Sequence, residues 1–146
     1  MLERLPLFAA ALWWGSLSAI GFMAVPLGFA TLPSRALAGH LGAVLFAAQT
    51  WVSLACGLVL LLSLKKNVAA AGAGKAQGAI ILVVLGLLLA VLLQYGVAPR
   101  IVARVNLALW HGVGTALYVL QWLCAGALLW RLSGRPKEQA DELTHR

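Results

Sequence analysis

The sequence predicts an all-α fold, an integral membrane four-helix bundle that could consist of two similar helical hairpins. Three observations support this prediction: four long runs free of charged residues, a hydrophobic content of 62% with a mean hydropathy of +0.93, and only 10% charged residues. A soluble domain of this length would need many more polar residues to cover its exposed surface. The chain is therefore expected to be an integral membrane protein.

Each apolar run is long enough to cross a bilayer, because about 20 helical residues span the hydrocarbon core. Within a transmembrane domain of residues 1–132, the predicted spans cover about 5–32, 36–64, 78–98 and 106–130, and a polar cytoplasmic tail follows at 133–146. Pro26 should kink the first helix or mark its outer end, and the third run is expected to end before Pro99. The Ala- and Gly-rich stretch 68–77 predicts a loop.

A secretory signal peptide is the alternative interpretation of the first run, because Arg4 precedes it and small residues follow at Ser16 and Ser18. The apolar region of a signal peptide is about 7–15 residues long. This run continues to Leu32, well beyond such a region. A membrane span is therefore the preferred interpretation.

The basic residues predict the orientation of the spans. Four spans place both termini on one side, together with eight of the 11 Lys and Arg residues; Arg35, Arg100 and Arg104 lie on the other side. Because Lys and Arg are retained on the cytoplasmic side, we expect a multi-pass protein of the bacterial inner (plasma) membrane with both termini in the cytoplasm. The lipid bilayer is the expected partner of these charges. No nucleic acid is expected, since the aromatic residues lie within the apolar runs.

An internal similarity suggests the two hairpins. In each half, a proline near the outer end of an odd-numbered helix is followed by a basic turn and then by His, Gln and Trp: His40, Gln49 and Trp51 in the first half, His111, Gln121 and Trp122 in the second. Such halves would be related by an axis along the membrane normal. The spacings match only with gaps, so chance similarity is the alternative.

His40 and His111 lie at similar depth, near the outer ends of even-numbered helices. If those helices are neighbours, the imidazoles could bind a metal ion or supply both axial ligands of a haem. Alternatively, each is an interfacial histidine bonded to a carbonyl or water. No cofactor is predicted outright; haem or copper is the alternative.

Gln49 and Gln121 fall near the middle of the membrane, where their amides need hydrogen-bond partners. They could join helices, or they could line a path for a polar ligand. Cys56 and Cys124 lie inside apolar runs and are expected to be buried thiols.

Tryptophans are expected at two depths. Trp13, Trp14, Trp110 and Trp130 can lie near the lipid headgroups. Trp51 and Trp122 should be deeper and pack between helices.

The acidic residues argue against proton-coupled transport and catalysis. Glu3, Glu138, Asp141 and Glu142 all lie outside the spans, whereas proton-coupled transporters usually need an intramembrane carboxylate. The spans also contain no combination of Ser, His and acid. No catalytic residue is predicted, and the non-enzymatic interpretation is preferred.

Several short motifs resemble a known family: Gly21-Phe22, Pro26, Phe29 and Leu32-Pro33, then Leu45-Phe46, Ala98-Pro99-Arg100 and His111-Gly112. The chain is similar, over about residues 8–130, to small bacterial membrane proteins of unknown function that resemble eukaryotic transmembrane protein 205. The resemblance implies a four-helix membrane domain and no reaction. Of the two histidines, only His111 falls on a motif position.

Two function hypotheses follow. The first is a non-enzymatic polytopic inner-membrane protein, an accessory to transport or a subunit of a membrane assembly, with itself or another membrane protein as partner. The second is a haem- or metal-binding redox or copper-handling protein that uses His111, with or without His40.

Overall fold

The computed structural model describes residues 4–71 and 73–134, which are helical apart from two short turns. The elements in order are α1 (Leu5–Ala19), η2 (Ile20–Ala24), α2 (Val25–Thr31), α3 (Arg35–Ala71), α4 (Ala73–Val91), η3 (Leu92–Val97), α5 (Ala98–Val102) and α6 (Leu107–Ser133). They form four helices long and apolar enough to cross a membrane: Leu5–Thr31, Arg35–Lys65, Gln77–Val102 and Leu107–Ser133. The described ranges contain no strand, and the prediction of an all-α membrane bundle is confirmed.

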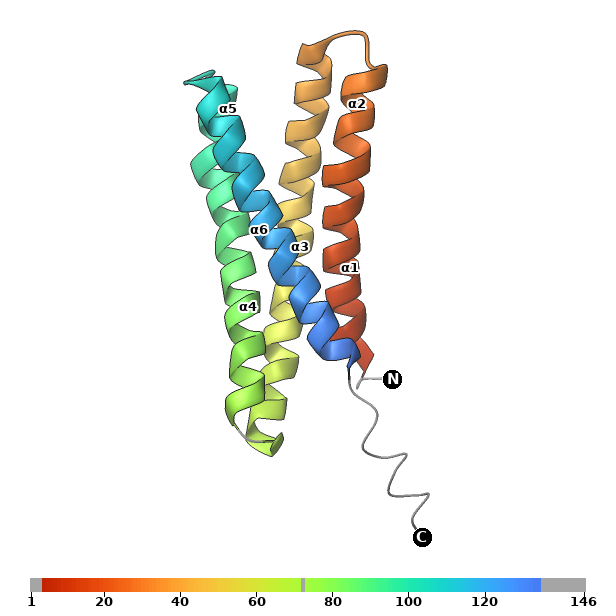
Figure 1. Ribbon diagram of the computed structural model, residues 1–146, viewed down its shortest axis with the longest axis vertical. Coiled ribbons are helices and arrows are strands. Elements are labelled where there is room, and N and C mark those ends of the chain that lie inside the picture. The colour runs from red at the N-terminus through yellow and green to blue at the C-terminus, as the bar shows by residue number, and fades with distance from the viewer. Residues whose placement is uncertain (1–3, 72, 135–146) are drawn as a thin grey trace.

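In the bundle, α1 packs against α3 and α6, and α4 packs against the same two helices. α3 and α6 therefore lie diagonally opposite each other. The start of α1 and the end of α6 lie at one end of the bundle, here called the terminal end (Figure 1). The turns at 32–34 and 103–106 lie at the opposite end, the loop end (Figure 1).

The packed core lies toward the terminal end. Its fully buried side chains come from all four spans: Trp13, Leu17, Leu60, Val83 and Leu128. Cys56 and Cys124 are buried free thiols, as predicted. Many large apolar side chains point outward, which suits a surface that meets lipid rather than water.

One tryptophan lies differently from its predicted environment. Trp51 is 68% exposed on the outer surface instead of packing between helices, whereas Trp13 is fully buried between helices. The reason is the rotation of each helix about its axis. The face of α3 that turns inward carries Gln49 and Ser53, so Trp51 points outward.

Near the loop end, each half of the chain packs mainly on itself. α2 packs mainly against α3, while α5 packs against η3 and α6. In both halves an α-helix, a π-helical segment and a short α-helix form the first arm of a hairpin, and one long helix forms the second. This common element order agrees with the interpretation of the chain as two similar hairpins.

Both π-helical segments come immediately before a proline. η2 ends two residues before Pro26, and η3 ends two residues before Pro99. Proline cannot donate the usual backbone hydrogen bond, and its ring crowds the carbonyl of the preceding turn. A wider π-helical turn accommodates this crowding. As a result, the third span continues through Pro99 to Val102, past its predicted end at Ala98.

The prediction of a loop at 68–77 is wrong. α3 continues to Ala71, and α4 begins at Ala73. Alanine has the highest intrinsic helix propensity and dominates this stretch, which contains no proline. Residues 135–146, most of the predicted tail, lie outside the described residues.

The contact of the Trp13 side chain with α4 gives a testable prediction. A Cβ at Gly86 would lie 2.8 Å from Cη2 of the buried Trp13, so Gly86→Val should overpack the core and lower the free energy of unfolding by about 1–3 kcal/mol. SDS-induced unfolding followed by circular dichroism measures the change. Gly15→Val is the matched control, because a Cβ there meets no atom within 4 Å. Equal losses in both variants would contradict this packing.

Candidate functional site

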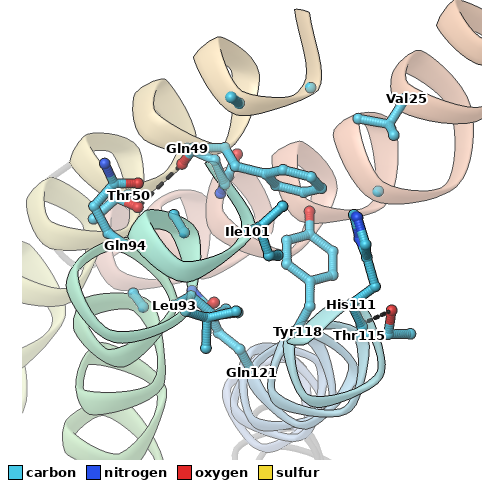
Figure 2. A pocket seen from close by; sticks show the side chains of 18 of the residues that line it. Val25, Gln49, Thr50, Leu93, Gln94, Ile101, His111, Thr115, Tyr118 and Gln121 are labelled. Atoms are coloured by element: carbon cyan, nitrogen blue, oxygen red, sulfur yellow. Dashed lines mark hydrogen bonds between the residues drawn. The ribbon is translucent and has the colours of Figure 1, made fainter. Parts of the chain in front are cut away.

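A cavity of about 590 Å³ lies between the two hairpins in the half of the bundle that ends at the loops. Its volume falls in the range of about 300–1,000 Å³ that is typical of small-molecule sites. Its walls come from all four spans. The apolar part of the lining includes Phe22, Val25, Phe29, Phe46, Leu93, Val97, Ile101, Val102 and Val119 (Figure 2 shows many of the lining side chains).

The polar part of the lining is rich in amides and hydroxyls. It consists of Gln49, Thr50, Ser53, Gln94, His111, Thr115, Tyr118 and Gln121, and no Asp, Glu, Lys or Arg of the described chain lines the cavity. Arg100 lies beside lining residues, but its guanidinium stacks 4.4 Å from the centroid of the Trp110 ring and donates to the Gly96 carbonyl oxygen at 2.6 Å. The guanidinium therefore contacts a ring and a carbonyl oxygen that do not line the cavity.

A hydrogen-bonded junction closes the cavity toward the packed core. Gln121 Nε2 donates to Ser53 Oγ at 3.1 Å, which joins α6 to the diagonally opposite α3. Gln49 Nε2 donates to Ser16 Oγ at 3.0 Å, which joins α3 to α1. A longer contact of 3.5 Å runs from Gln49 Nε2 to Ser53 Oγ. Three spans thus meet through four side chains that are buried or half-buried.

The Gln49 amide turns its NH₂ group toward two serines. Ser16 Oγ donates its proton to the Trp13 carbonyl oxygen at 3.0 Å, and Ser53 Oγ donates to the Gln49 carbonyl oxygen at 2.9 Å. In this arrangement each hydroxyl accepts from the NH₂ group. Gln49 Oε1 is left buried without a hydrogen-bond partner among the described residues, on a side chain that is 3% exposed.

Aromatic side chains hold α6 against the first span beside the cavity. The Tyr118 hydroxyl donates to the Leu17 carbonyl oxygen at 2.8 Å, and its ring meets Phe46 edge to face with centroids 5.2 Å apart. One turn further along α6, Trp122 Nε1 donates to Ser18 Oγ at 2.8 Å. These contacts fix the wall from which Tyr118 and His111 enter the cavity.

The structure brings together three of the four predicted site residues. Gln49, Gln121 and His111 all line the cavity, and His111 lies on the face of α6 that also carries Tyr118 (Figure 2). His40 is exposed on α3 and is not part of the lining. The helices that carry the two histidines, α3 and α6, are diagonal rather than adjacent, and of the two histidines only His111 lines the cavity. Within the described residues, no three His, Cys, Asp or Glu side chains are grouped to hold a metal ion.

Sequence reasoning missed five polar residues of the lining: Thr50, Ser53, Gln94, Thr115 and Tyr118. Ser53 lies four residues after Gln49 and Tyr118 lies three residues before Gln121, so helical spacing alone puts each on the same face as a predicted glutamine. Gln94 is the one amide in the third apolar run, a signal as strong as those of Gln49 and Gln121.

Fold and cavity together define a class: a multi-pass membrane protein of two helical hairpins, with a cavity between them that no Asp, Glu, Lys or Arg of the described residues lines. Residues 8–108 match the model of the family described as Domain of unknown function (DUF4149), and the chain belongs to this family. The match includes Gln49, Ser53 and Gln94 and ends before His111 and Gln121. No curated protein and no solved structure matches the chain.

The junction at Ser53 predicts a stability difference between two serines of α3. Ser53→Ala leaves the buried Gln121 amide without its acceptor and should lower the free energy of unfolding by about 1–2 kcal/mol. Ser63→Ala should change it little, because that hydroxyl bonds only to the Val59 carbonyl oxygen of its own helix. SDS titration of both variants checks the prediction, and a neutral Ser53→Ala would show that the junction does not stabilise the bundle.

Proposed function

We propose that this protein is a non-enzymatic component of the bacterial inner membrane that binds a small, uncharged and largely apolar molecule between its two hairpins. In this role it serves as an accessory to transport or as a subunit of a membrane assembly. The observation that supports the proposal is the cavity of about 590 Å³, with apolar walls and neutral polar groups concentrated at its inner end.

The lining favours a neutral ligand over an ion. A charge brought to membrane depth needs a countercharge or strong hydration, and no Asp, Glu, Lys or Arg of the described residues lines the cavity to supply a countercharge. Aromatic and branched aliphatic side chains offer contact area to an apolar body. We infer the non-enzymatic role from the sequence, since the spans contain no carboxylate.

Assembly with other membrane proteins is part of the same proposal. The exposed surface of the described spans is rich in large apolar side chains, such as Phe8, Leu58 and Leu88, which suit either lipid or a partner helix. A second copy of the chain is one partner of this kind. The proposed resemblance to eukaryotic transmembrane protein 205 is based on the sequence motifs alone, and it implies a membrane domain without naming a ligand.

Labelling in vesicles tests the binding of a neutral molecule. A diazirine-bearing long-chain methyl ether should label cavity peptides in phosphatidylcholine vesicles more strongly than chain-matched carboxylate or trimethylammonium probes do, as peptide mass spectrometry can show. Gly39→Phe should reduce the ether labelling severalfold, because Gly39 lines the cavity and a Cβ there meets no atom within 4 Å.

Gly112→Phe is the matched control for this substitution. Gly112 also has open space around it, but it does not line the cavity. This variant should keep the labelling of the unaltered chain. Labelling of cavity peptides no stronger than that of lipid-facing peptides would overturn the proposal.

The proposed orientation has its own test. Green fluorescent protein fused after Arg146 should fluoresce, and alkaline phosphatase fused there should be inactive, because eight of the 11 Lys and Arg residues lie on the side of the termini. Fusions within the turn at 103–106 should give the opposite pair of results. An active phosphatase after Arg146 would show that the orientation is reversed.

A further inference from the structure

We infer that the molecule bound in the cavity is an amphiphile with a neutral hydrogen-bond donor, a hydroxyl or an amide N–H, and that Gln49 Oε1 accepts this hydrogen bond. The inference depends on the proposed binding function and specifies the class of ligand. It is based on the hydrogen-bond inventory of the lining.

One hydrogen-bond acceptor beside the cavity is unpaired. Gln49 Oε1 is buried beside the cavity and has no partner among the described residues, while the amide nitrogen is held by Ser16 and Ser53. Both serine hydroxyls donate to backbone carbonyl oxygens, which matches the orientation of the amide in the structure. A buried acceptor without a donor is costly, and a ligand that brings a donor removes that cost.

The hydroxyl protons of the lining are already used in hydrogen bonds. All four hydroxyl side chains of the lining already donate to a carbonyl oxygen: Thr50 to Phe46 at 3.0 Å, Ser53 to Gln49 at 2.9 Å, Thr115 to His111 at 2.9 Å and Tyr118 to Leu17 at 2.8 Å. In this arrangement, any further hydrogen bond to these hydroxyls is one that the hydroxyl oxygen accepts. Gln49 Oε1 and these hydroxyls therefore act as acceptors, which a ligand hydroxyl or N–H complements.

The spans contain no carboxylate that could balance a positively charged ligand. The four Asp and Glu residues of the chain are at positions 3, 138, 141 and 142, so none lies within the spans. An ammonium group would also donate hydrogen bonds, but its charge would have no carboxylate near it at membrane depth. A neutral hydroxyl or amide satisfies the acceptors without this penalty, and its apolar chain can contact Phe22, Phe46 and Val119.

The experiment compares two chain-matched diazirine probes in phosphatidylcholine vesicles that contain the full-length protein: a long-chain alcohol and its methyl ether. The alcohol should label the cavity peptides about five- to tenfold more than the ether, the ratio expected when a buried acceptor gains or lacks its hydrogen bond. Gln49→Leu should reduce this ratio to about one while the ether labelling persists, which shows that the cavity remains intact.

Gln77→Leu is the matched control, because it makes the same chemical change at an exposed position outside the cavity and should keep the preference for the alcohol. If Gln49→Leu does not fold by circular dichroism, Gln49→Met, which is unbranched like glutamine, replaces it. Equal labelling by both probes in the unaltered chain, or a preference that survives the loss of Gln49, would overturn the inference and leave the binding function intact. Absence of cavity labelling by either probe would instead overturn the binding function itself.

Discussion

Polar side chains inside a membrane must find their partners within the protein, and in this bundle they do so at Ser53. Its hydroxyl donates to the backbone of α3 and accepts from Gln121 of α6, while Gln49, one turn away, reaches Ser16 of α1. With little hydrophobic driving force between helices in lipid, such bonds and close packing determine which helix faces meet. The junction thus orients three of the four spans and marks the boundary between a packed half and a hollow half.

One half of the bundle is packed and the other is hollow, because large side chains fill the space between the helices only toward the terminal end. Toward the terminal end, Trp13, Leu60 and Leu128 close the interior, and Gly86 lets α4 approach the Trp13 ring. Toward the loop end, the π-helical segments before Pro26 and Pro99 widen the first arm of each hairpin, and the hairpins pack mainly on themselves. The space that remains is the cavity, with the polar junction at its inner end.

The range that matches the DUF4149 family covers three spans. It contains much of the polar inner end of the cavity, including Gln49, Ser53 and Gln94. His111, the histidine that sequence reasoning placed first, enters the cavity from the fourth span, beyond that range. Amides and hydroxyls, more than imidazoles, make up the polar lining of the cavity. A binding site of neutral acceptors is consistent with a chain that has no carboxylate within its spans.

The sequence by itself determined the fold class, the approximate spans and three of the site residues, because apolar run length and isolated polar residues are local properties of the chain. It misjudged 68–77 and the end of the third span, where alanine propensity and a π-helical turn extended the helices. Only the tertiary structure decided that His40 lies apart from His111, that Trp51 faces outward and Trp13 inward, and that Tyr118 reaches Leu17. These outcomes depend on how each helix is rotated and which helices are diagonal, and packing between residues distant in sequence sets both.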